Sequence, residues 1–386
     1  MFIHQLIDKN ENLIKAAFAL HQDGRVLPDS YLIDVDMFLK NAEKILHKAK
    51  EYKIKLYFML KQLGRNPYLA KELVRLGYEG AVVVDFKEAQ LMMQHQIPIG
   101  NVGHLVQIPE TMIPKTIAYR PEVITVYSYD KVKSIDKAAG DAGITQGILL
   151  RVYGDKDAIY SGQTAGISLN EVKDFALRVK GECKNIQIKG VTSFPCFLYD
   201  DEKRDIVPTN NLDTVKEAVE MLKELGITPD IINTPSATCV YTLDKIAAYG
   251  GNCGEPGHGL TGTTPLHAAR DMEEIPSVVY VSEISHNFKG EAYCYGGGHY
   301  RRSHASNTLV GKNMESAERL SVIVPNEDSI DYHFAISKEC TIGDTVLMAF
   351  RFQIFVTRSD VVLVKGISTG KPEVVGIYDS LGNKKE

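Results

Sequence analysis

The sequence predicts an α/β fold: a (β/α)8 barrel of the TIM type, followed by a separate β domain. Eight short apolar runs recur along the first two thirds of the chain. Amphipathic stretches with apolar residues three and four apart separate these runs. After about residue 275 the helical patterns stop and only short β-like runs remain. We therefore expect an N-terminal extension over residues 1–28, the barrel over 29–275 and the β domain over 276–386.

The predicted barrel strands are almost continuously apolar, which is typical of parallel strands that are covered on both faces. In chain order they are LYFML (56–60), AVVVD (81–85), HLVQI (104–108), VITVY (123–127), GILLRV (147–152), IKGVTSF (188–194), PDIINT (229–234) and a weaker run near NCGEPG (252–257). A doubly wound open sheet would also alternate strands with helices. The count of eight favours the barrel, as does the lack of a glycine-rich dinucleotide loop after the first strand.

The helices expected between these strands carry Asn, Asp or Ser near their starts and Gly near several of their ends. They are NPYLAKELVRLG, FKEAQLMMQHQ, DKVKSIDKAAGDAG, SLNEVKDFALRVKGE and NLDTVKEAVEMLKELG. In the β domain, the expected strands include SVVYVSEISHNFKGEAYCYGGG, RLSVIVP, DTVLMAF, FQIFVT, DVVLVKG and EVVGIYD. The extension contains one helical pattern, NENLIKAAFALHQ, for which packing on the β domain is one interpretation.

The charge and composition of the chain argue against some classes of binding partner. The chain has 44 basic and 49 acidic residues and a net charge of -5, which argues against nucleic acid or an anionic membrane surface. No run approaches the ~20 apolar residues of a membrane helix. The start lacks the basic and apolar segments of a signal peptide, and the six cysteines contain no CxxC pair. We expect a cytoplasmic protein that binds a small molecule.

Chemistry in such barrels lies at the carboxyl ends of the strands. The residues expected there are Lys61 after the first strand, Ser193 and Phe194 at the sixth, Ser236 after the seventh, and Glu255, Gly257 and His258 at the eighth. This set suits pyridoxal phosphate. A desolvated lysine amine bonds to the aldehyde of the cofactor, glycine-rich loops offer backbone N–H groups to its phosphate, and a carboxylate keeps its pyridine nitrogen protonated.

Each of these residues also has an ordinary structural interpretation. Lys61 could be a solvated strand end, and Glu255 could cap a turn. Ser236 could be the N-cap of the helix-like stretch that follows it. The three loops gather at one rim of the predicted barrel, and this favours the cofactor site.

The first ~275 residues resemble the alanine racemase and amino-acid decarboxylase superfamily, the fold-type III pyridoxal phosphate enzymes. YLIDVDMFLKNAEKI resembles the opening segment of that family, FMLKQ its lysine strand and TPSAT its phosphate loop. Within the superfamily the chain resembles the uncharacterised YhfX-type proteins. The resemblance implies a head-to-tail homodimer that acts on an amino acid. It also implies that Gln163, in SGQTAG, lies near the phenolic oxygen of the cofactor or near the substrate.

YCYGGGHYRR resembles the racemase motif with a catalytic tyrosine that reaches into the site of the partner subunit, which implies that role for Tyr295. Lys61 and Tyr295 would then be bases on opposite faces of the substrate α-carbon. Arg301 or Arg302 is the candidate cation that would activate the tyrosine; binding of the substrate carboxylate and an ordinary surface position are the alternatives for both. Tyrosines in β domains more often serve packing, so that interpretation also stays open.

Two positions depart from the racemase pattern. Racemases usually have arginine where Glu255 stands and histidine where Phe194 stands, whereas EPG is the decarboxylase form. The expected activity is racemisation or epimerisation at the α-carbon. Decarboxylation, β-elimination, aldol cleavage and non-catalytic binding of the cofactor remain alternatives. Cys294, His299 and His304 lack the tight pairing of the metal-binding relatives, so no metal site is expected.

Overall fold

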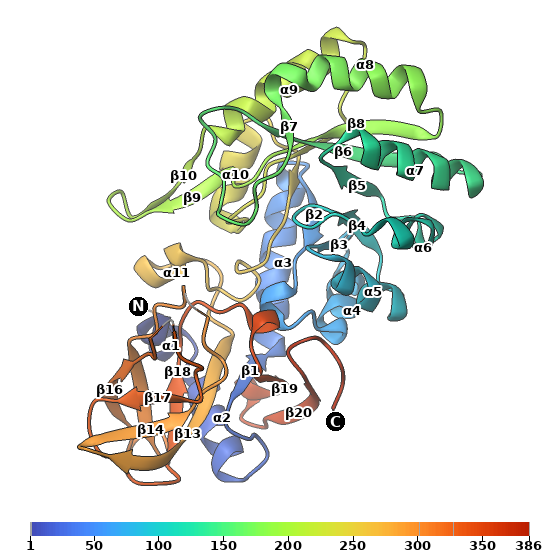
Figure 1. Ribbon diagram of the computed structural model, residues 1–386. Coiled ribbons are helices and arrows are strands. Elements are labelled where there is room, and N and C mark those ends of the chain that lie inside the picture. The colour runs from blue at the N-terminus through green and yellow to red at the C-terminus, as the bar shows by residue number, and fades with distance from the viewer. Residues whose placement is uncertain (1, 301, 327, 386) are drawn as a thin grey trace. The chain divides into compact units, whose positions relative to one another are not determined.

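The computed structural model describes residues 2–300, 302–326 and 328–385. The chain divides into two compact units. The barrel unit comprises Lys44–Leu60 and Ala70–Gly257, and the β unit comprises the chain up to Glu43, Lys61–Leu69 and the chain from His258 onward. Figure 1 shows the elements of both units in the order of the chain.

Eight parallel strands of the barrel unit form a closed ring. They are β2 (Lys55–Phe58), β3 (Gly80–Val83), β4 (Ile99–Val102), β5 (Val123–Val126), β6 (Gln146–Tyr153), β8 (Ile186–Thr192), β11 (Ile231–Asn233) and β12 (Cys253–Gly254). The first strand, β2, pairs with both β3 and the last strand, β12, while β5 pairs with both β4 and β6. The predicted (β/α)8 barrel is therefore confirmed, because an open sheet would leave two edge strands.

The helices follow the predicted alternation. They are α3 (Val35–Glu51), α4 (Pro67–Leu76), α5 (Phe86–Gln94), α6 (Ile113–Tyr119), α7 (Tyr129–Asp141), α8 (Val172–Glu182), α9 (Asn211–Glu224), α10 (Val240–Ala248) and α11 (Pro265–Ala269). Polar caps begin several of them: the Asp85 carboxylate accepts from the Glu88 N–H at 2.8 Å, and the Ser128 hydroxyl accepts from the Lys131 N–H. A short strand, β7 (Ile167–Ser168), extends β6, and β9 (Phe197–Asp200) pairs with β10 (Asp205–Pro208) as a hairpin after β8.

One predicted strand is wrong. HLVQI (104–108) contains no strand, and the third barrel strand is β4, with the sequence IGNV. Gly100 explains why this strand is hard to recognise: a Cβ there would lie 2.0 Å from the Tyr57 ring, so the position must lack a side chain. Tyr57 belongs to a buried cluster inside the barrel unit together with Met59, Val82, Val84, Val123, Leu149, Ile231 and Cys253.

The β unit contains a second closed arrangement of strands. Its strands are β1 (Ser30–Asp34), β13 (Val278–Phe288), β14 (Glu291–Tyr295), β15 (Asn307–Gly311), β16 (Glu318–Ile323), β17 (His333–Ile336), β18 (Thr345–Met348), β19 (Asp360–Lys365) and β20 (Glu373–Tyr378). Six of them close in the order β13, β14, β17, β16, β15, β18 and back to β13. This confirms the predicted β domain, although the segment FQIFVT holds a 3-10 turn, η4 (Ile354–Val356), in place of a strand.

The start of the chain belongs to this second sheet. β1 pairs antiparallel with β13 and parallel with β19, although it lies within the 29–275 range that we expected for the barrel. The helices α1 (Phe2–Lys9) and α2 (Glu11–Gln22) pack their apolar faces on the same unit. Leu13 and Phe18 share a buried cluster there with Val279, Leu347 and Val362.

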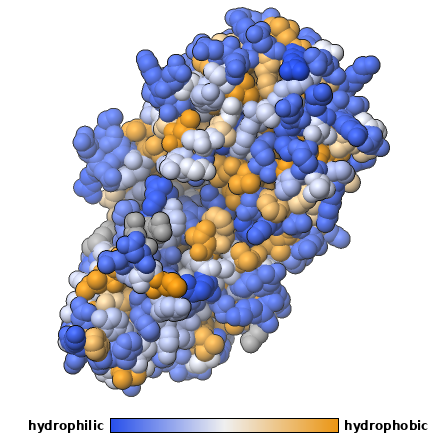
Figure 2. All heavy atoms as spheres, viewed as in Figure 1, coloured by the Kyte–Doolittle hydropathy of each residue, from blue (hydrophilic) through white to orange (hydrophobic). Residues whose placement is uncertain are grey.

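In the view of Figure 2, hydrophilic side chains cover much of the surface, with smaller apolar patches between them. Within the part of the chain that the structure describes, no helix has both the length and the apolar composition to cross a membrane.

Candidate active site

Glu255 is a buried carboxylate at the carboxyl end of the barrel strands. It follows β12 directly, is 5% exposed, and its Oε1 accepts a hydrogen bond from the Asn233 side-chain amide at 2.8 Å. Its backbone N–H donates to the Thr238 hydroxyl at 3.1 Å. Asn233 ends β11, and its amide also donates to Thr192, the last residue of β8, at 3.2 Å. Three neighbouring strand ends therefore fix the orientation of this carboxylate, as burial of such a group requires.

A histidine that the sequence analysis missed lies beside this carboxylate. His104 follows β4 by two residues and is fully buried, and its Nε2 lies 3.8 Å from Glu255 Oε2. Its ring meets that of Phe194 edge-on, with 5.6 Å between the ring centroids. The pattern HLVQI favours a strand that begins at His104, and a residue at the start of a strand does not stand out as a candidate for the site.

Arg151 is a second residue that was missed. It lies in β6, is 2% exposed, and donates to the carbonyl oxygen of His104 at 3.1 Å, to the Tyr127 hydroxyl at 3.1 Å and to the carbonyl oxygen of Gln163 at 2.9 Å. A buried arginine with three fixed acceptors serves as a scaffold for loops. The run GILLRV predicts a strand, and Arg151 lies inside it. A charged residue within an otherwise apolar strand indicates that its side chain has a specific partner.

Gln163 and Phe194 lie in loops of the same unit. The Gln163 side-chain Oε1 is buried and has no hydrogen-bond partner, so it presents an acceptor to a ligand. The Phe194 ring lies between the rings of His104 and Tyr160, at 5.6 and 5.7 Å. These two predicted residues therefore reach the same group of loops as Glu255.

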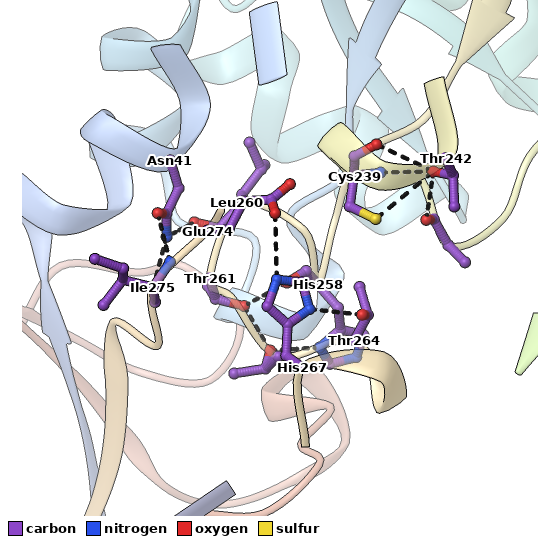
Figure 3. A network of polar contacts seen from close by, with 12 residues as sticks. Asn41, Cys239, Thr242, His258, Leu260, Thr261, Thr264, His267, Glu274 and Ile275 are labelled. Carbon is purple, nitrogen blue, oxygen red and sulfur yellow. Dashed lines mark hydrogen bonds and ion pairs between the residues drawn. The ribbon is translucent and has the colours of Figure 1, made fainter. Parts of the chain in front are cut away.

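Ser236 is not a helix N-cap. Its hydroxyl donates to the carbonyl oxygen of Phe197. The N-cap of α10 is Cys239, which forms a capping box with Thr242 (Figure 3). The alternative structural role that the sequence suggested for Ser236 is therefore wrong, and the hydroxyl retains its acceptor capacity.

Lys61 lies in the β unit, at the first residue of the 3-10 turn η1 (Lys61–Leu63). It is half-buried and is the third residue after β2, so the strand ends earlier than LYFML suggested. The turn closes on Gly64, whose φ is +66° and where a Cβ would lie 3.0 Å from the Val361 side chain. This packing fixes the backbone directly after the lysine.

His258 lies in the β unit with Lys61. Its Nδ1 is 3.0 Å from the Thr263 hydroxyl and its Nε2 is 3.3 Å from the Gln353 amide nitrogen. Burial lowers the pKa of His258 well below its usual value, and the cations Arg351 and Lys61 act in the same direction. The imidazole is therefore neutral near pH 7.

The chain that follows His258 is held by further polar contacts, which Figure 3 shows. The Thr261 hydroxyl donates to the His258 carbonyl at 3.2 Å. The side-chain amide of Asn41 donates to the carbonyl oxygens of Leu260 and Ile275, at 3.2 and 2.8 Å. Asn41, within α3, thus holds the loop in place from a distant part of the sequence.

Tyr295 ends β14 and is 40% exposed. Its carbonyl oxygen accepts from the Ser282 hydroxyl at 2.7 Å and from the Tyr280 hydroxyl at 3.4 Å. Its ring centroid is 6.3 Å from that of His333. The backbone of this tyrosine is thus fixed while its side chain reaches solvent in the single chain. Arg301, one of its two candidate cations, lies outside the described residues.

A half-buried carboxyl group supports the strand end that carries Tyr295. Asp29 has a φ of +60° and accepts from the Tyr280 hydroxyl at 3.0 Å and from the Ser359 hydroxyl. Burial raises the pKa of Asp29 to about 6, although those two hydrogen bonds and the Arg358 guanidinium oppose the shift. Gly297 must be glycine here, since a Cβ would lie 2.1 Å from the Asp29 carboxyl oxygen.

Two family models match the sequence. Residues 33–265 match the alanine racemase N-terminal domain, and residues 279–374 match the YhfX-like C-terminal domain. The chain belongs to the alanine racemase-like family. It is 43% identical over 385 residues to the uncharacterised protein YhfX of Escherichia coli strain K12, and the match covers 99% of each chain. The resemblance expected from YLIDVDMFLKNAEKI, FMLKQ and TPSAT is confirmed.

Solved structures that resemble this chain include proteins named as an aldolase, a racemase and a dehydratase. D-threonine aldolase from Filomicrobium marinum has a TM-score of 0.69 and 15% identity, over 92% of this chain and 94% of that one. Alanine racemase from Clostridium difficile 630, in complex with cycloserine, has a TM-score of 0.65 and 16% identity, over 92% and 99%. D-threo-3-hydroxyaspartate dehydratase from Delftia sp. HT23 has a TM-score of 0.65 and 12% identity, over 90% and 97%. These likenesses show the fold.

The predicted site residues of this alanine racemase-like chain fall into two groups. Gln163, Phe194, Ser236, Glu255 and Gly257 lie in the barrel unit, and Lys61, His258 and Tyr295 lie in the β unit. Across residues 2–300, 302–326 and 328–385, no three His, Cys, Asp or Glu side chains come together as a metal site.

Proposed function

We propose that this chain is a pyridoxal phosphate-dependent enzyme that acts at the α-carbon of an amino acid, as a racemase or epimerase. The observation that carries the proposal is Glu255, a buried carboxylate held by Asn233 at the carboxyl end of the barrel strands. A carboxylate fixed in a dry position matches the partner that a protonated pyridine nitrogen needs. When bound, the cofactor would supply an electron sink for the negative charge that develops at the α-carbon.

Lys61 would bind the aldehyde of the cofactor and hold a proton on one face of the α-carbon. Phe194 would pack against the ring, and Gln163 would offer its buried Oε1 to a donor on the ligand. Ser236, together with the backbone of Gly257 and His258, would hold the phosphate, since small residues allow close approach of backbone N–H groups.

Tyr295 would hold the proton on the opposite face, supplied by the partner subunit of a head-to-tail homodimer. Its 40% exposure in the single chain is consistent with this role. We also propose that the enzyme works in the cytoplasm. In support, all six cysteines are free thiols, as expected in a reducing compartment.

The central test is the yellow absorbance of the lysine-bound cofactor. The purified wild type, incubated with pyridoxal phosphate, should develop it, and Lys61→Ala should lose it. Lys50→Ala, which changes an exposed lysine on α3, is the matched control and should retain it. Equal absorbance in wild type and Lys61→Ala would show that the proposed cofactor linkage is wrong.

Solvent exchange identifies the reaction. A racemase or epimerase incubated with candidate amino acids in D2O should place α-deuterium in both stereoisomers. Tyr295→Phe should keep the absorbance and lose racemisation, while Tyr293→Phe in the same strand should keep both. Mixing Lys61→Ala with Tyr295→Phe chains should restore part of the activity if each site combines residues of two subunits.

Decarboxylation or lyase chemistry is the second candidate, and Glu255 and Phe194 favour it. Glu255 strengthens the electron sink more than the arginine of racemases would, and Phe194 replaces their usual histidine. The structural neighbours also include proteins named as an aldolase and a dehydratase. Release of carbon dioxide would identify a decarboxylase, and formation of a keto acid or aldehyde would identify a lyase. A protein that binds the cofactor without turnover would yield neither product nor exchange.

A further inference from the structure

The buried pair formed by His104 and Glu255 is more than a packing contact. We propose that His104 is a positioning residue that controls the field of Glu255, and through it the protonation of the ring nitrogen that Glu255 faces. This inference rests on the proposed function, because it assumes that a nitrogen heterocycle binds beside Glu255.

The position of His104 is built from several strands. Its carbonyl oxygen accepts from Arg151 at 3.1 Å and from the Tyr127 hydroxyl at 2.5 Å, so β6 and the end of β5 hold its backbone. Its ring meets the edge of Phe194, which follows β8, and its Nε2 lies 3.8 Å from Glu255 Oε2. With no exposed surface, the imidazole has no room to turn toward solvent.

Glu255, Arg151 and Tyr127 are charged or titratable groups that lie close to His104. The guanidinium of Arg151 is directed at carbonyl oxygens and a hydroxyl, and burial raises the pKa of Tyr127, so that phenol stays neutral. Burial also raises the pKa of the Cys253 thiol, two residues before Glu255, well above its usual range. Glu255 is therefore the carboxylate whose charge His104 meets most directly.

The coupling follows from electrostatics in a region of low dielectric. When His104 is neutral, the negative charge of Glu255 acts fully on the ring nitrogen and keeps it protonated. When His104 takes up a proton, its positive charge opposes that field, and the ring nitrogen loses its proton more readily. A ring nitrogen without its proton is a weaker electron sink, so the state of His104 would set how far the enzyme stabilises a carbanion.

The test is a pH titration of cofactor absorbance in four chains: wild type, His104→Gln, Glu255→Gln and the double variant. The proposal requires His104 to hold its proton, through the charge of Glu255, at the pH of the ring-nitrogen transition. His104→Gln should then move the midpoint of that transition upward by at least one pH unit, a tenfold change in its proton affinity. In the Glu255→Gln background the same substitution should move it by less than a third of a unit. The control His47→Gln, on an exposed position of α3, should leave the midpoint unchanged. An equal shift in both backgrounds, or none in either, would overturn the proposal.

A second measurement needs no cofactor. In the apo protein, thermal unfolding of the same four chains forms a double-mutant cycle, and the losses caused by the two single substitutions should not add. If the losses of stability in the two single variants add up to the loss in the double variant, the pairing of His104 with Glu255 is contradicted, whatever the outcome for the proposed function. Conversely, a wild type that binds no pyridoxal phosphate would refute the proposed function and leave this cycle informative. If His104→Gln does not fold, the wild-type titration should show a histidine step that Glu255→Gln lacks, and persistence of that step would overturn the proposal.

Discussion

Replacing Asp29 with asparagine should stabilise the β unit relative to the wild type as the pH rises from 4 to 7. The carboxyl group is held against Gly297 and accepts hydrogen bonds from Tyr280 and Ser359. Asparagine has the same shape, keeps the accepting oxygen and tolerates the positive φ of this position. The substitution therefore removes the ionisation and little else.

The expected size follows from the pKa shift. Burial raises the pKa of Asp29 from 3.8 to about 6. The folded state thus binds the proton more tightly than the unfolded state. The stability that this proton binding contributes is fully present below pH 3.8 and is lost as the pH rises through 6. A difference of about 2 units corresponds to at most about 3 kcal/mol.

The assay is urea unfolding of the wild type and Asp29→Asn at pH 4, 5, 6 and 7. The stability advantage of the variant should grow across the series and level off above about pH 6.5. Asp8→Asn, an exposed aspartate on α1, serves as the control and should show no such growth. An advantage of Asp29→Asn that stays constant from pH 4 to 7 would show that the carboxyl group is not buried in this way.

The packing of the barrel unit gives two further predictions. Gly100→Ala should destabilise the fold by roughly 1–3 kcal/mol or more, because the new Cβ would lie 2.0 Å from the Tyr57 ring. The control Gly181→Ala adds a Cβ with no neighbouring atom within 4 Å and should not lower the melting temperature. Equal melting temperatures for the two variants would contradict this packing. Arg151→Lys should lower the free energy of unfolding by about 1–3 kcal/mol, because one ammonium group cannot reach the three acceptors of the guanidinium. Arg178→Lys, at an exposed position, is the control. An equal loss of stability in both variants would refute the scaffold role of Arg151.

The sequence predicted the architecture because the alternation of apolar runs and amphipathic stretches directly reflects a barrel with helices around it. It failed at β4, where the closeness of the Tyr57 ring demands glycine and removes the apolar signal. It also included residues 30–34 in the barrel range. An apolar strand is equally suited to either sheet, and its pairing with β19 depends on residues near the other end of the chain.

The site could be predicted in part. The sequence marks Lys61 and Glu255 as candidates because they stand next to strand ends in short distinctive loops, and their roles stay predictions. His104 and Arg151 were missed because each lies in or beside an apolar run, and only the closed ring brings them toward Glu255 and Gln163. Contacts between residues so far apart in the sequence arise from strand order, which no local pattern contains.

The pairing of β1 with β13 and β19 has a consequence for biosynthesis. The barrel is in effect a domain inserted into the β unit, between its first strand and the later strands that pair with that strand. During translation β1 stays without a partner strand until β13 has been made, and it gains its second partner only with β19. Contacts between residues so far apart in the sequence form slowly. The inserted barrel, whose strands are contiguous in the sequence, would then fold first, and synthesis of β19 would set the moment at which β1 is paired on both sides.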